Sequence, residues 1–273
     1  MKPKQIFSVA HFLFGGILFL ILLLLCSTAR FLPKRLNPND TRSKMAASES
    51  ISSVLLDPTE DLGDEYIQKI TFLGESTTYG LWHYGVLRGG KTSEQVWTGA
   101  TVQNGKVCCA GTLSLSPSIT STKLFYPATG EALTLSEALQ RKKPEILVIT
   151  LGLNNGASYY TEDMFKQCYR MLIQSVKSSS PETVILVQSI FPVAKSCMIG
   201  AYTPERIRLC NTWLCDLALE YDLGYLDTAS ALSDAEGYLK PEYDNGGDGI
   251  HLNREGLLEV LRYIRTHGYL EEA

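Results

Sequence analysis

Residues 145–156 read EILVITLGLNNG, an unbroken apolar run that ends in a glycine and two asparagines. An apolar run of this length without polar alternation is typical of a strand buried on both faces of a parallel sheet. Residues 70–73 (ITFL) and 183–190 (TVILVQSI) have the same character, and residues 223–226 form a shorter run. We therefore expect four parallel strands at the centre of the fold.

Helices are predicted between these strands. Thr161 is placed to cap a helix whose first turn carries Glu162 and Asp163, and acidic residues are favourable at the positive end of a helix. Thr203-Pro204-Glu205 opens a second helix, with proline at its first position. The apolar residues of the first helix recur with a period of 3.6 and predict its buried face: Met164, Phe165, Cys168, Met171, Leu172 and Val176.

The last predicted helix begins near Asn253 and stops before Gly268. Its predicted buried residues are Leu257, Leu258, Leu261 and Ile264. Strands that alternate with helices imply an α/β fold, with a parallel sheet covered by helices on both faces. Sites in such sheets form at the carboxyl ends of the strands. Residues 80–140 are rich in Gly, Ser and Thr, and we expect short extra strands there that include Val102 and Leu113–Leu115.

Polar residues follow the first two of the strong strands. Gly74 permits a tight turn after residues 70–73, and Ser76 follows at the start of a helix, where free backbone N–H groups stabilise an anion. Asn154 follows the next strand, where its amide can donate a hydrogen bond to a developing oxyanion. Each residue has an ordinary alternative, because serine is a common helix cap and Asn-Asn-Gly is good turn sequence.

A third polar segment, Asp248-Gly249-Ile250-His251, lies just before the last helix. A carboxylate three residues from an imidazole can bond one ring nitrogen and leave the other free to act as a base. The alternative is a polar loop with an incidental histidine. The chain has four histidines, and the other three are His11, His83 and His267. His83 follows the serine segment too closely in sequence to be an obvious partner for it.

Together the three segments resemble the SGNH, or GDSL-like, hydrolase family, over roughly residues 68–270. That family carries Gly-Asp-Ser after the first strand, Gly-x-Asn-Asp after a central strand and Asp-x-x-His before the last helix. Here the three read GES, GLNN and DGIH, in the same order. The resemblance implies a three-layer α/β/α fold with a central parallel sheet, of the flavodoxin-like SGNH type. It further implies that Ser76 is the nucleophile, His251 the general base and Asp248 its orienting acid.

The resemblance also implies an oxyanion hole. Its donors would be the backbone N–H of Ser76, the side chain of Asn154 and the backbone N–H of a glycine from the loop after the second strand. Gly111 is the candidate for that glycine, and Gly105 is the alternative.

Two residues depart from the family pattern. Glu75 and Asn155 each stand where the family usually has Asp, beside the predicted catalytic positions. These departures concern loop geometry more than the chemistry. A G-x-S-x-G elbow is absent from the sequence, which argues against the ordinary α/β-hydrolase fold. The implied mechanism is two-step acyl transfer through a covalent intermediate, which needs no metal and no cofactor.

The N-terminus predicts a membrane segment. Residues 9–29 are almost entirely apolar, and a helix of 21 residues spans about 30 Å, the thickness of a bilayer core. We therefore expect an N-terminal transmembrane helix within residues 1–30, a polar tether over residues 31–65 and the hydrolase domain over residues 66–273. A cleaved signal peptide, or a buried helix of a soluble protein, is the alternative. The catalytic domain is expected outside the cytoplasm, and would be secreted if the signal is cleaved.

The amino-acid composition indicates which classes of partner can be expected. The chain is 45% hydrophobic and 20% charged, which is ordinary for a globular protein with one large core. Its net charge is −4 and no basic stripe runs through it, so nucleic acid is not an expected partner. The seven cysteines include no CxxC pair. Cys168 and Cys210 are predicted to be core residues, and pairing among the others is left open.

The predicted function is hydrolysis of small acyl esters, acetyl esters among them, of glycans or cell-envelope components. An acyltransferase or a lysophospholipase would use the same machinery, and a non-catalytic surface module of the same fold is the third possibility. Four aromatic residues near Ser76 in sequence are candidates to line a substrate cleft: Tyr79, Trp82, Tyr84 and Trp97. Aromatic residues more often belong to the core, which is the alternative for these four.

Overall fold

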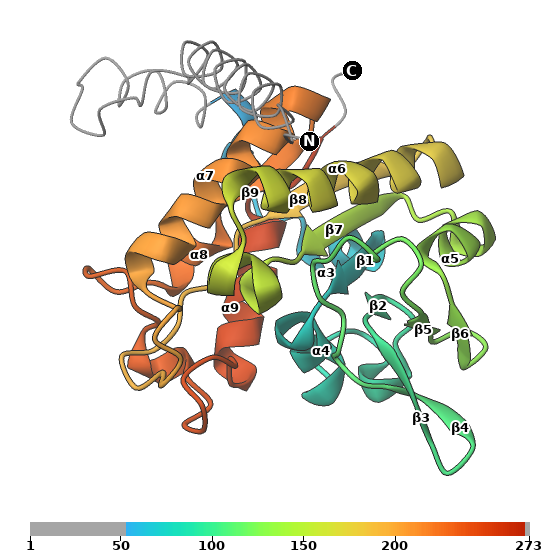
Figure 1. Cartoon of the computed structure of the whole chain (residues 1–273), viewed down its shortest axis with the longest axis horizontal. Helices are drawn as coiled ribbons and strands as arrows, with labels where there is room; N and C mark the ends of the chain where they lie inside the picture. The colour runs from blue at the N-terminus through green and yellow to red at the C-terminus, as the bar shows by residue number, and fades with distance from the viewer. Residues whose placement is uncertain (1–52, 271–273) are drawn as a thin grey trace, which may run out of the picture. The chain divides into compact units, whose positions relative to one another are not determined.

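The centre of the fold is a five-stranded parallel sheet with the order β2-β1-β7-β8-β9, seen in a computed structural model that describes residues 53–270 (Figure 1). Its strands are β1 (Ile70–Gly74), β2 (Val96–Trp97), β7 (Ile146–Thr150), β8 (Val184–Gln188) and β9 (Gly224–Leu226). The strand order reverses between β1 and β7, and ligands bind outside the carboxyl ends of the strands at such a point. β1 and β7 are in register from Ile70–Ile146 to Gly74–Thr150, so both strands end at the same level.

Helices cover both faces of this sheet. Successive side chains of β7 point to opposite faces and are buried in two different clusters. Leu147 and Ile149 belong to one buried cluster, whereas Ile146 and Val148 belong to another on the opposite face. The first face is covered by α5 (Leu135–Lys142), α6 (Glu162–Ser179) and α7 (Pro204–Tyr221). The second is covered by α3 (Gly63–Gln68), α4 (Ser76–His83), α8 (Thr228–Leu232) and α9 (Arg254–Arg265). The predicted α/β fold with a central parallel sheet is therefore confirmed.

The predicted helix starts are also confirmed. The side chains of Thr161, Thr203 and Asn253 each accept a hydrogen bond from a backbone N–H in the first turn of α6, α7 and α9. The predicted burial was wrong at some positions. Met164 is exposed, and Met171 and Leu258 are half-buried. Tyr169, Ile173 and Val260 are buried in addition to the other predicted residues, because the contact face of each helix is rotated slightly from the predicted one.

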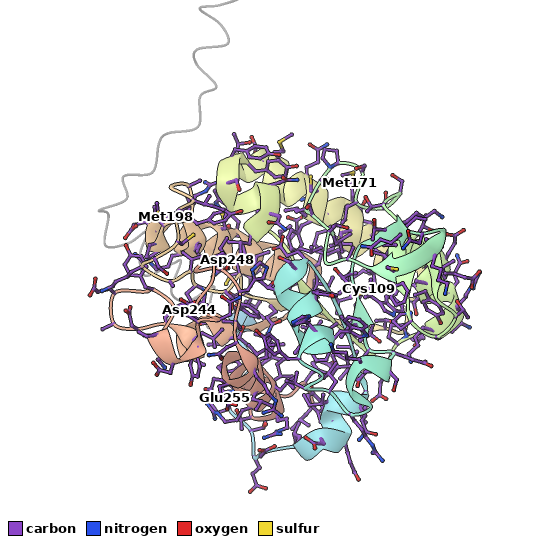
Figure 2. All side chains as sticks on the ribbon, turned by 90° about the horizontal axis from the view of Figure 1, so that it is seen from below. Cys109, Met171, Met198, Asp244, Asp248 and Glu255 are labelled. Atoms are coloured by element: carbon purple, nitrogen blue, oxygen red, sulfur yellow. The ribbon has the colours of Figure 1, made fainter. Side chains whose placement is uncertain are left out.

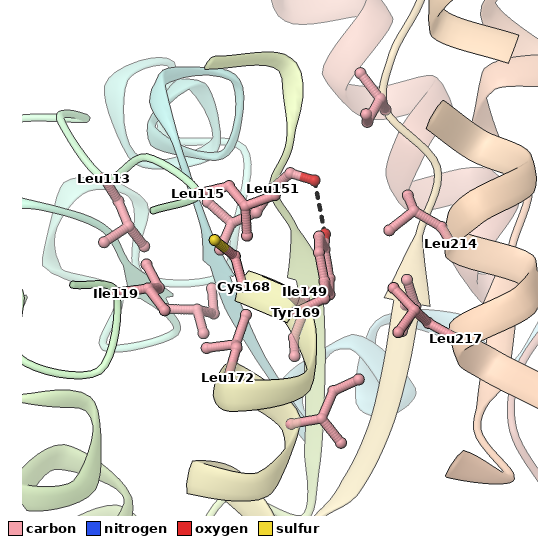
Figure 3. Packing of buried hydrophobic residues seen from close by; sticks show 14 of the residues in the cluster. Leu113, Leu115, Ile119, Ile149, Leu151, Cys168, Tyr169, Leu172, Leu214 and Leu217 are labelled. Atoms are coloured by element: carbon pink, nitrogen blue, oxygen red, sulfur yellow. Dashed lines mark hydrogen bonds between the residues drawn. The ribbon is translucent and has the colours of Figure 1, made fainter. Parts of the chain in front are cut away.

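The region between Gly80 and Gln140 contains short elements that the sequence showed poorly. It forms two antiparallel pairs, β3 (Ala100–Gln103) with β4 (Lys106–Cys109) and β5 (Leu124–Tyr126) with β6 (Glu131–Leu133). Short 3-10 turns occupy Gly90–Thr92 and, later in the chain, Pro241–Tyr243. Val102 lies in a strand as expected. Leu113–Leu115 does not form a strand; Leu113 and Leu115 instead pack into the core against α6 (Figure 3).

The domain begins earlier than the predicted boundary at residue 65. Leu55 forms a parallel bridge with Tyr225 of β9, and the backbone N–H of Leu56 donates to the Tyr225 carbonyl at 3.1 Å. The N–H of Thr59 donates to the Thr266 carbonyl at 2.7 Å, at the end of α9. Residues 53–65, predicted as the last part of a tether, therefore belong to the folded domain.

The predicted transmembrane helix lies outside the described residues. Within residues 53–270, no helix is both long enough and apolar enough to cross a bilayer. The six cysteines of this part of the chain are free thiols, and Cys168 and Cys210 are buried as predicted.

Candidate active site

The turn from β1 into α4 positions Ser76. The strand ends at Gly74, and Ser76 is the first residue of the helix. A Cβ atom on Gly74 would lie 2.5 Å from the Thr150 carbonyl oxygen and would also overlap the Thr78 side chain. Only glycine fits where strand β1, strand β7 and helix α4 approach so closely. Ser76 therefore lies at the carboxyl edge of the sheet, at the positive end of a helix.

Three predicted residues meet at this point. The Nε2 atom of His251 lies 2.8 Å from the Ser76 hydroxyl oxygen, although the two residues are 175 positions apart. The Nδ1 atom of His251 lies 2.6 Å from a carboxylate oxygen of Asp248. Figure 2 labels Asp248 on the surface of the molecule, in the loop before α9. The imidazole thus contacts a hydroxyl on one side and a carboxylate on the other.

The Asp248 carboxylate is held by its own loop. Its second oxygen accepts hydrogen bonds from the backbone N–H groups of Ile250 at 2.9 Å and His251 at 3.1 Å. Partial burial opposes ionisation of Asp248, but these N–H groups and the His251 ring outweigh it and hold its pKa below the usual value. Gly249 makes the turn possible, because its φ is +70° and a Cβ there would lie 2.7 Å from the Cys197 backbone nitrogen.

Gly111 lies directly beside Ser76. A Cβ on Gly111 would lie 3.2 Å from the Ser76 Cα and 3.1 Å from the Tyr79 Cβ, and its φ is +62°. Gly105, the alternative, is in the β3–β4 hairpin with open space around it. The hairpin projects from the body of the molecule (Figure 1). Of the two glycines, only Gly111 is therefore close to the serine.

Asn154 lies in a single π-helical turn, Leu153–Ala157, that follows β7. Two residues of this loop have positive φ, Gly152 at 122° and Asn155 at 65°. The Asn155 amide donates to the Leu115 carbonyl at 3.1 Å, which ties the turn to the core. Within the part of the chain that the structure describes, the side-chain amide of Asn154 has no hydrogen-bond partner, so it is available to a ligand.

Glu75 connects the serine turn to the asparagine turn, a contact that was not predicted from the sequence. Its side chain is buried, and its two carboxylate oxygens accept hydrogen bonds from the backbone N–H groups of Leu153 and Asn154, each at 2.8 Å. Burial raises the pKa of Glu75 to about 8, against the opposing effect of hydrogen bonds from the loop N–H groups. Its place between Gly74 and Ser76 was the only sequence signal for this role.

A pocket of about 220 Å³ opens beside Ser76 and His251. Tyr79, His83 and Tyr84 of the α4 region line it, and Asn245 contributes a polar group. The His83 ring packs edge-on against Tyr84 with centroids 5.0 Å apart, and lies 5.9 Å from the Tyr79 ring. The pocket has an aromatic wall with polar groups at its rim.

Two of the four predicted aromatic cleft residues lie elsewhere. Trp97 is fully buried in the core beside Tyr126, so the core alternative holds for it. Trp82 is not among the lining residues, and its Nε1 donates to the Lys91 carbonyl at 2.7 Å. Among residues 53–270, no group of three His, Cys, Asp or Glu side chains is arranged to hold a metal ion.

Comparison with known protein families finds a match to one family. A family model described as the GDSL-like Lipase/Acylhydrolase family matches residues 72–257, which is more than half of the chain. A search of the curated proteins found no match.

Two solved structures with TM-scores of 0.51 and 0.50 support the same fold at low sequence identity, and a third is similar at a lower score. A Streptococcus pneumonia protein named as a platelet activating factor shares 21% identity with a TM-score of 0.51, over 81% of this chain and 97% of its own. A lipolytic protein of the G-D-S-L family from Desulfitobacterium hafniense DCB-2 shares 16% with a TM-score of 0.50, over 72% and 97%. A carbohydrate esterase family 3 protein from Talaromyces cellulolyticus shares 17% with a TM-score of 0.45, over 72% and 93%.

Proposed function

The chain belongs to the GDSL-like lipase/acylhydrolase family and is a hydrolase, and from this premise we propose that it is a serine esterase with a Ser76-His251-Asp248 triad. The observation that carries the proposal is the 2.8 Å contact between the Ser76 hydroxyl and His251 Nε2. A nucleophile and its base must come within hydrogen-bond reach, and these two residues do so. Asp248 completes the relay, because its carboxylate bonds the other ring nitrogen.

The proposed reaction has two steps. His251 Nε2 takes the proton of the Ser76 hydroxyl as its oxygen attacks the ester carbonyl carbon, and the imidazolium then protonates the leaving alcohol. This leaves an acyl group on Ser76. A water molecule attacks the acyl carbon with His251 again as the base, which releases the acid and restores the serine. Asp248 holds the neutral ring with its proton on Nδ1, so that Nε2 is the free base.

The proposed oxyanion hole uses three donors around Ser76. They are the backbone N–H groups of Ser76 and Gly111 and the side-chain amide of Asn154. Gly111 is supported by its closeness to Ser76, since a Cβ on Gly111 would lie 3.2 Å from the Ser76 Cα. Asn154 is supported by its unused amide and its place after β7. Each such donor is typically worth about 3 kcal/mol of transition-state stabilisation.

The proposed substrates are small acyl esters of glycans or cell-envelope components, acetyl esters among them. The pocket beside Ser76 has about 220 Å³, which suits a compact group better than a long chain. Aromatic faces with polar neighbours match the alternating apolar and hydroxylated faces of a sugar ring, and Tyr79, His83, Tyr84 and Asn245 supply both. A lysophospholipase or an acyltransferase remains the second candidate, since either would use the same triad.

One experiment tests the enzyme class and a second tests the substrate. A fluorophosphonate probe is expected to label the wild-type protein and not Ser76→Ala; equal labelling of both would contradict the assignment, and no labelling of either would favour a non-catalytic module. Acetylated sugars and lysolipids should then be compared as substrates of the unlabelled wild-type enzyme. Faster release of acetate than of fatty acid supports the glycan proposal, and the reverse order supports a lysophospholipase.

We propose further that residues 1–30 anchor the protein in a membrane with the catalytic domain outside the cytoplasm. The support is the apolar run over residues 9–29 and the polar stretch that follows it. The full-length protein is expected in the membrane fraction, with its domain accessible to protease added outside the cell. Release of a shortened chain that lacks residues 1–30 would instead indicate a cleaved signal peptide.

A further inference from the structure

Glu75 joins the two catalytic turns through one side chain. It directly precedes Ser76 in the chain, and its carboxylate accepts the N–H groups of Leu153 and Asn154 at 2.8 Å each. The two contacts join residues that lie 78 and 79 positions apart in the sequence. The positions of the nucleophile and of the proposed oxyanion donor therefore both depend on one residue, Glu75.

The Asn154 turn needs such an external support. Its backbone departs from regular structure, with positive φ at Gly152 and Asn155. The hydrogen bond inside the turn, from the Ala157 N–H to the Gly152 carbonyl at 2.7 Å, leaves the N–H groups of Leu153 and Asn154 to an acceptor outside it. The far side of the turn is held by Arg206, whose guanidinium donates to the carbonyls of Gly156 and Ala157 at 2.9 Å each. On the side nearest Ser76, the Asn154 backbone is held by Glu75.

Burial at this position is costly for a carboxyl group. Glu75 is only 2% exposed, and a buried carboxylate is tolerated when backbone N–H groups satisfy it. A methionine or glutamine of similar size would fill the same space without a charge. Each carboxyl oxygen of Glu75 accepts from one backbone N–H, whereas a glutamine would turn an NH₂ group, which cannot accept, towards one of the two.

We propose that Glu75 is a positioning residue that sets the place of Asn154 relative to Ser76, an inference that rests on the proposed esterase function. Glu75 does not touch the reacting atoms. It acts through the backbone of Asn154, whose side chain is the proposed oxyanion donor. Its length matters as well as its two acceptor oxygens, because an aspartate would be shorter by one carbon–carbon bond and could not keep both contacts unless the turns moved together.

A double-mutant cycle tests this inference with p-nitrophenyl acetate as the substrate. Glu75→Gln is expected to lower kcat by about 10- to 100-fold while changing KM little, since the donor acts mainly in the transition state. In an Asn154→Ala background the same change should lower kcat less than about threefold, because coupled residues are not additive. Equal factors in both backgrounds would overturn the proposal and leave Glu75 with a structural role only.

Two further variants distinguish an effect on catalysis from an effect on folding. Thr183→Val removes a buried hydrogen bond of similar length, from the Thr183 hydroxyl to the Pro144 carbonyl at 2.7 Å, at the end of β7 opposite to the Asn154 turn. It is expected to lower thermal stability but to leave kcat within about twofold; a loss equal to that of Glu75→Gln would overturn the proposal. If Glu75→Gln does not fold, Glu75→Asp replaces it in the cycle, with the same two outcomes.

The proposed role of Glu75 and the proposed esterase function can also be rejected independently of each other. If Ser76→Ala hydrolyses the ester as fast as the wild type, the esterase assignment fails whatever Glu75 does. If Ser76→Ala is inactive and the cycle is additive, the esterase assignment stands and only the role of Glu75 fails.

Discussion

The two halves of the proposed site are built in opposite ways. In the half that carries Ser76 and Asn154, the two residues are half-buried, and the buried side chain of Glu75 ties them together across 78 and 79 positions of sequence; we call it the buried half. The half that carries Asp248 and His251 is partly exposed, at 46% and 35% of the two side chains, and its contacts span three positions or fewer. The first half depends on the assembled sheet, whereas the second is encoded in one short loop.

The difference indicates where precision is needed. An oxyanion donor must be placed relative to a tetrahedral centre, and a rigid anchor suits that task. A base has to take and return a proton, and a loop open to solvent permits this with less exact placement. Mutations in the buried half should therefore lower activity by displacing the groups of the site. The effect of mutations in the exposed half should be smaller, because water can replace the lost contacts.

The largest effect is expected where the two halves meet. Ser76→Ala and His251→Ala should each lower kcat by about 10⁴- to 10⁶-fold, because members of a triad act as a unit. Steady-state hydrolysis of p-nitrophenyl acetate, with circular dichroism as a check of folding, measures this. His83 is the rival base on α4. Loss of activity in His83→Ala with activity retained in His251→Ala would reject the proposed base.

Within the buried half, Asn154→Ala should slow turnover by about 100- to 1000-fold, the usual effect of removing one oxyanion donor. The Ser76–His251 pair does not depend on the Asn154 side chain, so the serine should still react with a fluorophosphonate. Turnover and labelling rate measured on the same preparation separate the two steps. Undiminished turnover would show that Asn154 is not a donor.

Within the exposed half, Asp248→Asn should be milder, with kcat lowered by about 100-fold. An asparagine amide would donate to His251 Nδ1 and place the ring proton on Nε2, where the base is needed. Because Asp248 is 46% exposed, water can partly restore the correct tautomer. A pH–rate profile of the variant gives the measurement. An effect as large as that of His251→Ala would contradict the comparison between the two halves.

The two carboxylates should also respond to pH with opposite sign. Burial raises the pKa of Glu75 from 4.5 to about 8, so the folded protein holds this proton more tightly than the unfolded chain. The contribution of Glu75 to stability is complete below about pH 4.5 and is lost as the pH rises towards 8. Relative to Glu75→Gln, the free energy of unfolding of the wild type should fall by an amount on the order of 4 kcal/mol across this range, since one pKa unit corresponds to about 1.4 kcal/mol. The groups that face Glu75 are the phenols of Tyr169 and Tyr202, whose pKa values are raised by burial, so they stay neutral.

The smallest effect is expected from Asp248. Its pKa is lowered from 3.8, because hydrogen bonds to the carboxylate outweigh partial burial. Its contribution to stability is therefore present above about pH 3.8 and is lost as the pH falls through the folded value. Since the group is half exposed, the difference from Asp248→Asn should stay below about 1 kcal/mol. Urea unfolding of both proteins at several acidic pH values measures it. A wild type that gains stability relative to Asp248→Asn as the pH falls below about 3.8 would contradict this sign.

Sequence patterns predicted the elements that carry their own signal. The strands 70–73 and 145–151 are apolar except for Thr71, Glu145 and Thr150. Thr161, Thr203 and Asn253 are capping residues next to segments with helical periodicity. The Asp248–His251 contact could be predicted for the same reason, since both residues lie in one four-residue segment.

Contacts between distant segments could not be predicted in this way. The Glu75 carboxylate contacts residues that the sequence places 78 and 79 positions away, and nothing near Glu75 marks them. Leu113 and Leu115 alternate as a strand would, but they pack against α6 without a neighbouring strand to pair with. Trp97 lies on the short strand β2, which is only two residues long and gives no periodic signal.

The contact of Leu55 and Leu56 with β9 has a consequence for how the protein behaves in solution. An edge strand presents unpaired N–H and carbonyl groups, which are a template for pairing with another chain. The Leu56 N–H occupies the Tyr225 carbonyl, and the Leu56 side chain covers Gly224, where a Cβ atom would approach it to 3.0 Å. A domain cut at Asp61 would keep every residue of the proposed site and lose this cover. It would be expected to self-associate through the uncovered strand.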